Sequence, residues 1–423
     1  MHRFLSSTLL AAGLVVFTAS LVAAQPQAPA DAPEHPPEHD HAAMMAAEAK
    51  PRWTPMWDGV VFGTYVKQTG VRGDSQFRSQ NWLMLMAHRP IGTGTLTLNG
   101  MFSVEPATIG AAGYLELFQH GEAYKGLPVV DAQHPHDAFM QLDASFAQPF
   151  GKTTLIVSGG PSSSPALGPP AFMHRLSAAE NPTAPLTHHT FDSTHVTFGV
   201  ATIGVRRGWF TFEASAFQGR EPDWKRWDLN LGAFDSGSAR LTVRPHPEVE
   251  FQVSRGRLIS PEELEPGNQN RTNGSLSWTR MHPDGGFTAI TLLSGRVSRT
   301  YSWTGAFVAE GTHWMGNTAV FGRYEGTGIE SEHLLFPGVV HAPHPGELVD
   351  KLHAVTAGVT RRLFKQAGVD VALGGDVTFY KVPERLVDAY GARPIGAHLT
   401  FRIRPARSTP MTMDHTMPAG HQH

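Results

Sequence analysis

The sequence predicts an all-β fold, a transmembrane antiparallel β-barrel of about 16 strands, from two patterns. The first is a period of two in short segments. In segment 138–147 the even-numbered residues from Met140 to Phe146 are apolar, and the odd-numbered residues from Gln141 to Ser145 are polar. Such a strand has one apolar and one polar face. The second pattern is the alternation of tight turns and long loops, which is typical of outer-membrane barrels.

Alternation and turn residues place the sixteen strands in order along the chain. The expected ranges are 58–69, 80–89, 94–105, 138–148, 152–160, 194–206, 208–218, 237–245, 248–258, 272–281, 286–297, 303–312, 315–325, 351–362, 368–381 and 394–404. Connections alternate along the chain, and about every second one is a tight turn such as Pro90–Thr93 or Pro149–Gly151. The remaining connections include the long loops 106–137, 161–193, 219–236, 326–350 and 382–393.

An even strand number puts both chain ends on the periplasmic side, with the short turns there and the long loops outside. Aromatic residues near the tight turns fit an interfacial girdle; they are Trp53, Trp57, Phe150 and Trp209. The alternative is a soluble all-β sandwich or lectin-like domain, whose strands alternate in the same way.

The first residues read as an export signal. His2 and Arg3 precede the apolar stretch Leu9–Val22, and small residues follow up to a cut expected before Gln25. We therefore divide the chain into a signal peptide, 1–24; a disordered tail rich in His, Met and Pro, 25–52; the barrel, 53–405; and a C-terminal tail rich in His and Met, 406–423. The chain has 0 cysteines, which excludes disulfides and thiolate metal sites, and its net charge of -3 argues against nucleic acid as a partner.

Both tails carry histidine and methionine. Imidazole suits copper, zinc and nickel, and thioether sulfur suits Cu(I), so the mixture points first to copper or silver. The barrel topology brings both tails to the periplasmic mouth. The alternative is that the tails are solvated spacers. The candidate ligands are His35, His39, His41, Met44, Met45, Met411, Met413, His415, Met417, His421 and His423.

A second group of histidines lies in two long loops separated by a single hairpin. One loop ends in Gln133–Asp137, and the other contains Met173–Arg175 and Thr187–His195. We expect these histidines to converge at the outer rim or in the lumen and to hold Zn or Cu with a carboxylate. A hydrogen-bonded loop anchor and acid–base catalysis are the alternatives. The candidate residues are His134, His136, Asp137, His174, His188, His189, Asp192 and His195.

The alternation also assigns charged residues to the lumen, where opposed charges tune which solutes pass. Pairing for stability is the alternative. The residues are Glu213, Arg240, Arg244, Glu250, His398, Arg402 and Arg404.

Several segments together resemble a group of uncharacterised bacterial outer-membrane or exported β-barrel proteins. They are Asn81–Pro90, Gln133–Met140, Ala166–Arg175, Thr187–His195 and Gly219–Pro222, and the resemblance spans about Trp57 to Pro405. The tails are similar in kind to those of copper-resistance outer-membrane proteins. The resemblance brings no activity with it. Many barrels end on a terminal aromatic residue that the assembly machinery reads. This chain differs, because a long tail follows Phe401.

The function expected is that of an outer-membrane porin-like barrel for small polar solutes or metal ions, linked to copper or heavy-metal handling. Its expected partners are outer-membrane lipid, the barrel assembly machinery and metal ions, with Cu or Zn as the candidate cofactor. The competing hypotheses are a membrane-embedded or exported metal-dependent hydrolase that uses the loop histidines, and a structural or adhesion barrel. Ser193 and Thr194 lie beside His195, but no Gly-x-Ser-x-Gly elbow accompanies them.

Overall fold

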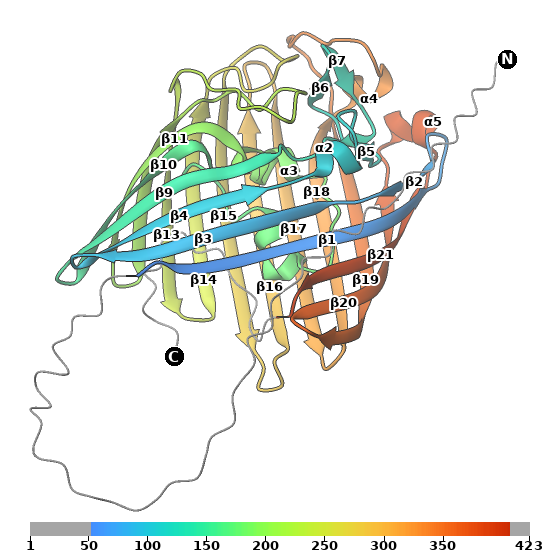
Figure 1. Cartoon of the computed structure of the whole chain (residues 1–423). Helices are drawn as coiled ribbons and strands as arrows, with labels where there is room; N and C mark the ends of the chain where they lie inside the picture. The colour runs from blue at the N-terminus through green and yellow to red at the C-terminus, as the bar shows by residue number, and fades with distance from the viewer. Residues whose placement is uncertain (1–51, 407–423) are drawn as a thin grey trace, which may run out of the picture. The chain divides into compact units, whose positions relative to one another are not determined.

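A computed structural model describes residues 52–406, which form a closed antiparallel barrel (Figure 1). Its main sheet contains 17 strand segments, and β2 and β3 follow one another along the same side of β1, so the wall has 16 strands. The last strand closes the barrel on the first, with a register that runs from Val61 opposite Ile403 to Gln68 opposite Gly396. The predicted fold class is confirmed. The predicted signal peptide and the tail residues beyond 52–406 lie outside the described part of the chain.

The wall strands follow the predicted order. Their bounds are β1 Thr54–Gln68, β2 Ser75–Arg78, β3 Asn81–Ile91, β4 Gly94–Phe102, β9 Phe139–Phe150, β10 Thr153–Ser163, β11 Thr197–Arg207, β12 Phe210–Phe217, β13 Ser236–His246, β14 Val249–Leu258, β15 Gln269–Met281, β16 Phe287–Ser298, β17 Trp303–Met315, β18 Thr318–Glu330, β19 Val349–Gln366, β20 Val369–Lys381 and β21 Ile395–Pro405.

The remaining elements are short and lie in the long loops. They are α2 Glu105–Thr108, β5 Tyr114–Leu115, β6 Glu122–Tyr124, β7 Leu127–Val129, β8 Ala132–Gln133, η1 Phe172–His174, η2 Leu176–Ala178, α3 His188–Phe191, η3 Ser193–His195, α4 Ser331–Leu335, η4 Glu384–Leu386 and α5 Val387–Tyr390. In the part of the chain from 52 to 406, no helix has both the length and the apolar character needed to cross a membrane.

Tight hairpin turns join the strands at one end of the barrel. Two residues separate β3 from β4 and β9 from β10, and the first residue of each turn is a glycine, Gly92 at φ 59° and Gly151 at φ 60°. A positive φ at the first central position is what a type II′ turn requires, and this turn matches the twist of paired strands. The predicted short connections therefore form at one end, and the long loops gather at the other (Figure 1).

The outer surface of the barrel is apolar and its interior is polar. In β14, Phe251 and Val253 are 45% and 57% exposed, whereas Gln252 and Ser254 are 2% and 5% exposed. A soluble sandwich would bury the apolar face, so the alternative of a soluble domain is wrong. A closed barrel satisfies every strand's hydrogen bonds within the wall and can present an apolar band to lipid. The predicted location in the outer membrane follows from this architecture and is confirmed.

Several strand boundaries differ from the sequence prediction by a few residues, and two of these differences have a clear local cause. The second wall strand begins at Ser75 rather than at 80 and is interrupted between β2 and β3. The backbone N–H of Asn81 donates there to Glu105 Oε1 at 3.1 Å, so a loop residue takes a place in the hydrogen bonding of the wall. The sixth strand begins at Thr197 rather than at 194, because residues 193–195 turn tightly and the N–H of His195 donates to the Asp192 carbonyl at 2.9 Å.

Loop 103–138 and loop 331–348 cover the barrel end opposite the tight turns. Leu117 and Phe118 pack in one buried apolar cluster with residues of β18, β19, β20 and the loops around them. The ring of Phe118 stacks on Tyr390 at a centroid distance of 4.3 Å. This packing holds loop 103–138 above the lumen, where its polar residues meet the next long loop.

Candidate functional site

Residues 164–196, here called the inner loop, fold into the barrel and attach to its wall. Figure 1 shows the short helices of this segment, drawn in green, inside the ring of strands. Arg175 is the central anchor: its Nε donates to Glu310 of β17 at 2.6 Å, and its Nη1 donates to Asp192 at 3.0 Å. All three side chains are at most 3% exposed. A buried arginine with two carboxylate partners fixes both ends of the inner loop to one strand.

Further contacts attach the inner loop to other strands around the wall. Glu180 accepts hydrogen bonds from Trp314 Nε1 at 3.1 Å and from Arg404 at 3.2 Å, and it also pairs with Arg402. Near its start, the loop donates from the N–H of Gly168 to Ser254 Oγ at 2.8 Å. The inner loop thus spans the lumen from β14 to β21.

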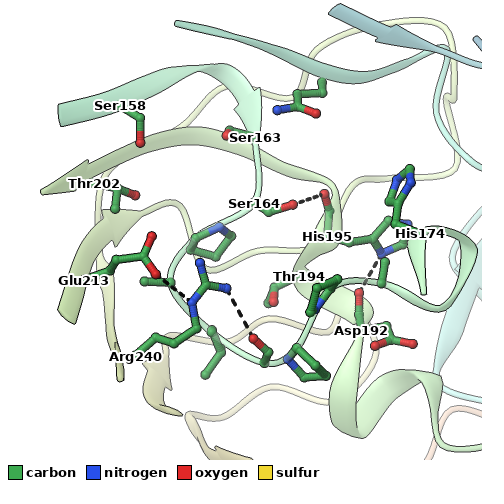
Figure 2. A pocket seen from close by; sticks show the side chains of 18 of the residues that line it. Ser158, Ser163, Ser164, His174, Asp192, Thr194, His195, Thr202, Glu213 and Arg240 are labelled. Atoms are coloured by element: carbon green, nitrogen blue, oxygen red, sulfur yellow. Dashed lines mark hydrogen bonds and ion pairs between the residues drawn. The ribbon is translucent and has the colours of Figure 1, made fainter. Parts of the chain in front are cut away.

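Two cavities flank the inner loop. The first, of about 110 Å³, is lined by strands β4 and β9 to β14 and contains Glu213 and Arg240, which pair at 2.9 Å (Figure 2). The second, of about 430 Å³, runs along β1, β3 and β21 toward the tight turns and reaches Arg362 and Lys365. His174 borders both cavities, and its ring lies edge-on to Trp82 with centroids 5.2 Å apart.

The charged residues predicted for the lumen lie in ion pairs with one another or with further acids. Arg244 and Glu250 line the first cavity and pair at 2.6 Å. His398 pairs with Asp376 at 2.7 Å. Arg402 and Arg404 contact Glu180, and Arg402 also bonds Asp370 at 3.0 Å. Each of the seven predicted residues therefore has an oppositely charged neighbour, so their charges are largely compensated inside the barrel.

The loop histidines lie close together around His188, which is 1% exposed. Its ring centroid lies 6.0 Å from that of His134, 5.6 Å from His189 and 5.3 Å from His195. His136 extends the group, since its ring lies 5.3 Å from that of His195. The group joins the end of loop 103–138 to the end of the inner loop.

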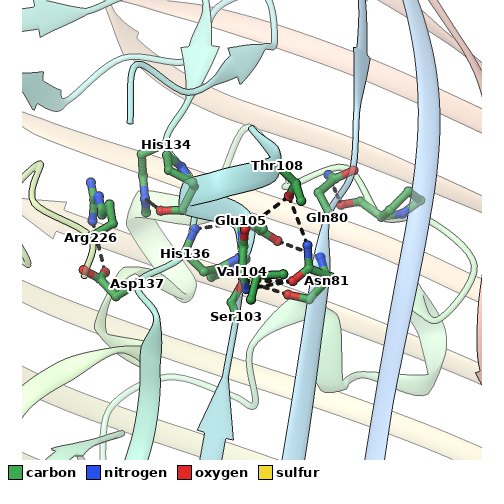
Figure 3. Close-up of polar contacts among 12 residues, drawn as sticks. Gln80, Asn81, Ser103, Val104, Glu105, Thr108, His134, His136, Asp137 and Arg226 are labelled. Carbon is green, nitrogen blue, oxygen red and sulfur yellow. Dashed lines mark hydrogen bonds and ion pairs between the residues drawn. The ribbon is translucent and has the colours of Figure 1, made fainter. Parts of the chain in front are cut away.

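Several members of this group are held by protein partners (Figure 3). Glu105 Oε2 lies 2.9 Å from His136 Nδ1 and also accepts the His136 backbone N–H at 2.8 Å. Asp137 pairs with Arg226 at 3.1 Å, as Asp192 does with Arg175. The two aspartates that were expected to accompany the histidines on a metal are therefore engaged by buried arginines. Through these contacts His136, Asp137 and Asp192 anchor the loops by hydrogen bonds, which was the alternative to metal binding in the sequence analysis.

A glutamate that sequence reasoning missed faces the remaining histidines. Glu122 Oε1 lies 3.0 Å from His134 Nε2 and 3.9 Å from His189 Nε2. Glu221, from the loop between β12 and β13, brings a ligand atom within 4.8 Å of those of Glu122 and His189. The only sequence signal for Glu221 was its place in the Gly219–Pro222 segment. The sequence around Glu122 shows no spacing typical of metal ligands, so this residue was not identified from the sequence.

Burial sets the protonation of this site. It lowers the pKa of His188 and His195 well below the usual value and also lowers the pKa of His189. Burial, with Glu122 nearby, raises the pKa of Glu221 to about 8. For Glu122 burial acts in the same direction, but His134 and Arg226 outweigh it and hold the pKa of Glu122 below its usual value. His188, His189 and His195 thus present neutral imidazoles, the form that binds metals.

A neighbouring polar cluster lies between loops 103–138, 259–268 and 331–348. His120, Glu330 and His333 have ligand atoms within 4.8 Å of one another. Arg299 pairs with Glu262 at 3.3 Å, Glu265 at 3.4 Å and Glu330 at 3.2 Å. Carboxylates outnumber arginines here, so the outer mouth of the barrel is acidic and rich in histidine.

A closed 16-strand barrel with an apolar exterior and an infolded loop is a porin-like outer-membrane barrel. No protein-family model and no curated protein sequence matches the chain. Among solved structures, the chain is similar to a loop-deletion mutant of OmpT from Vibrio cholerae, with 8% identity over 83% of this chain and 99% of the other and a TM-score of 0.49. The anion-selective porin from Comamonas acidovorans is 11% identical over 84% of this chain and 100% of the other, with a TM-score of 0.49. Pseudomonas putida OprB is 8% identical over 83% of this chain and 94% of the other, with a TM-score of 0.48.

Proposed function

We propose that the protein is a restrictive outer-membrane porin that passes small polar solutes and metal ions and takes part in copper or heavy-metal handling. One observation supports this most strongly. His195 borders the first cavity and His136 the second, and their rings lie 5.3 Å apart, so imidazoles occupy the partition between the two spaces. Imidazoles between two cavities of the lumen suit the capture of passing copper and zinc ions, because imidazole is a ligand for both.

The inner loop limits the size of the solute. An unobstructed barrel of 16 strands has an aqueous channel. Here the anchors of Arg175 and Glu180 hold the inner loop across the lumen, and cavities of about 110 Å³ and 430 Å³ remain on its two sides. Such spaces suit hydrated ions and small polar molecules rather than peptides or sugars of several units.

Conductance in planar lipid bilayers tests the proposal. We expect the folded full-length protein to give small, stable conductance steps that micromolar Cu(II) or Zn(II) reduces. Substitution of both partition histidines, His136→Gln with His195→Gln, should remove the metal effect and leave conductance in metal-free buffer. The matched control is His344→Gln, because the side chain of His344 is 45% exposed in loop 331–348. Correctly folded protein without any conductance would contradict the proposal.

The link to copper draws on the tails, whose residues lie outside the described range 52–406. Their methionines and histidines suit Cu(I) and Ag(I). From the sequence, both tails are expected at the periplasmic mouth. Replacement of the tail methionines by leucine in the full-length chain should weaken Cu(I) binding at least tenfold in a competition assay with a chromogenic chelator. Unchanged Cu(I) affinity would remove the tails from this function.

A serine-nucleophile hydrolase built on Ser193 has no comparable support. It would need that serine within hydrogen-bond reach of a histidine base. Ser193 Oγ instead contacts Arg271 Nη1. The Nδ1 of His195 lies 2.6 Å from the Asp192 carbonyl, and its buried Nε2 has no hydrogen-bond partner.

A further inference from the structure

Three loops bring carboxylates and imidazoles together at a place adjacent to the partition, since His188 lies next to His134, His189 and His195. Glu122 and His134 come from loop 103–138, His189 from the inner loop and Glu221 from the loop between β12 and β13. One oxygen of Glu122, Oε1, faces both imidazoles, at 3.0 Å from His134 Nε2 and 3.9 Å from His189 Nε2. Glu122, His189 and Glu221 have ligand atoms within 4.8 Å of one another. Ligands of a tetrahedral ion bonded at about 2.0–2.2 Å are about 3.2–3.6 Å apart, so small side-chain rotations would bring Glu122, His189 and Glu221 to these distances. His134 approaches this group through its contact with Glu122.

Neighbouring arginines orient the two glutamates. Arg226 Nη2 lies 3.4 Å from Glu122 Oε2, which leaves Oε1 directed at the histidines. Arg271 Nη2 lies 3.3 Å from Glu221 Oε1. Partners that hold the ligands of a metal in this way raise its affinity by fixing their orientation.

Backbone geometry brings His189 close to loop 103–138. Gly121, just before Glu122, has a φ of +104°, and a Cβ atom there would lie 3.5 Å from Cε1 of the His189 ring. A side chain at this position would be strained by the backbone and would be in van der Waals contact with the imidazole. The Nδ1 atom of His189 is buried and has no hydrogen-bond partner.

The site has more carboxylates than arginines and can be reached from outside. Arg226 is shared between Glu122 and Asp137, so three carboxylates, including Glu221, face two arginines. A cavity of about 240 Å³, lined by Glu122, Arg220 and Trp224 among others, reaches both glutamates from the loop surface.

We propose that Glu122, His134, His189 and Glu221 form a binding site for a divalent first-row transition-metal ion such as Zn(II). This inference rests on the proposed function and deepens it, because it names the class of ion and the point at which that ion is captured before it reaches the partition. Two nitrogen and two oxygen donors favour Zn(II), Co(II) and Cu(II), whereas Cu(I) and Ag(I) prefer sulfur. The site therefore selects a different class of ion from the methionine-containing tails.

Equilibrium binding tests the site separately from conduction. The parent is the full-length chain with its tail histidines and methionines replaced by serine, so that tail ligands do not contribute. We expect one Co(II) ion per chain with the visible absorption of a four-coordinate site, displaced by one equivalent of Zn(II). Glu122→Gln with Glu221→Gln should weaken Co(II) binding at least tenfold. The matched control is Glu213→Gln, another buried glutamate paired with an arginine, and it should leave the affinity unchanged.

Two results would overturn the site: equal Co(II) affinity in the double variant and its parent, or a spectrum without tetrahedral bands in the parent. The heat-dependent gel mobility of folded barrels shows whether each variant is folded. If the double glutamate variant does not fold, His189→Gln serves instead, and retention of full affinity in that variant has the same meaning. Metal-free conductance is measured on the same samples, so loss of the channel and loss of the metal site are read independently.

Discussion

At the scale of single residues, buried carboxylates hold the outer loops in place. Glu105 is 1% exposed and has three partners: the N–H of Asn81 at 3.1 Å, the N–H of His136 at 2.8 Å and the His136 ring at 2.9 Å. Its interaction with His136 outweighs burial and lowers the pKa of Glu105. A single glutamate thus joins the interrupted wall strand to the end of loop 103–138.

Replacement of Glu105 should therefore be costly. Glu105→Ala leaves two buried backbone donors without partners, and we expect a loss of about 2–4 kcal/mol in the free energy of unfolding. Glu105→Gln keeps an acceptor and should cost less than half as much. Urea unfolding in detergent micelles measures both. Equal stabilities of the alanine variant and the parent would show that water replaces the carboxylate at this position.

Glu265 should make stability depend on pH. Burial and the nearby Glu262 raise its pKa to about 8, while it lies 2.8 Å from His333 Nδ1 and 3.4 Å from Arg299 Nε. The pKa of His333 is also raised, because its contact with Glu265 outweighs burial. Glu330 and Glu347 are the other acids whose charges act on this group. A raised pKa means that the folded state binds the proton more tightly than the unfolded state, so stability is present at low pH and falls as pH rises from about 4.5 to 8.

We expect the free energy of unfolding to fall by at least about 1 kcal/mol between pH 5.5 and pH 8.5, since one pKa unit corresponds to about 1.4 kcal/mol. Glu265→Gln should flatten this dependence. Denaturant titrations at the two pH values test it. The control is Glu263→Gln, an exposed glutamate of the same loop, whose pH profile should match that of the parent. A parent whose stability rises over this interval would contradict the assignment.

The inner loop is the element that distinguishes this barrel from an open pore. Its attachments reach β14, β17 and β21. Those to β17 and β21 are buried arginine–carboxylate pairs, and loss of either partner would leave an unpaired buried charge. None of these partners is close to the loop in sequence. The closed state of the lumen is therefore a property of loop–wall contacts and not of the strands themselves.

Replacement of residues 164–196 by a short Gly-Ser linker should open the lumen. The flanking strands β10 and β11 pair along their length, from Thr153 opposite Arg207 to Ser163 opposite Thr197, so the hairpin has its own register. We expect single-channel conductance to rise severalfold, toward that of an unobstructed 16-strand barrel. The control replaces loop 331–348 in the same way and should change conductance little. An unchanged conductance after removal of the inner loop would mean that loop 103–138 closes the channel.

Strands could be predicted well from sequence because their pattern is local. Alternation and turn residues located all sixteen wall strands, since each face of a strand meets either lipid or the lumen throughout its length. The break between β2 and β3 could not be predicted, because it depends on Glu105, which lies 24 residues from its partner Asn81. The start of β11 differed for a similar reason, as the tight turn at 193–195 depends on how the inner loop is packed.

The site was predictable in part. The histidines of Gln133–Asp137 and Thr187–His195 stood out by type, and the topology put their loops on neighbouring hairpins. Glu122, Glu221 and Arg226 did not stand out, because single charged residues in loops are common and their pairing is decided by packing between loops. The same packing gives Asp137 and Asp192 arginine partners that no spacing in the sequence indicates.

At the scale of the whole molecule, charge and polarity are arranged in layers. Apolar side chains cover the outside of the wall, compensated ion pairs fill the lumen, and surplus carboxylates with histidines surround the outer mouth. An acidic mouth concentrates cations by electrostatic attraction. The same arrangement requires lipid around the wall, because its apolar band would be exposed in water.

Dependence on lipid gives the last prediction. Val253, in the middle of β14, and Val339, in loop 331–348, are 57% and 53% exposed. Val253→Arg places a charge in the hydrocarbon layer and should destabilise the folded barrel in lipid bilayers by about 2–4 kcal/mol. Val339→Arg places the same charge in water and should change stability by less than about 0.5 kcal/mol. Both are measured by denaturant titration in vesicles. Equal effects of the two substitutions would show that β14 does not face the bilayer core and would overturn the membrane placement of the barrel.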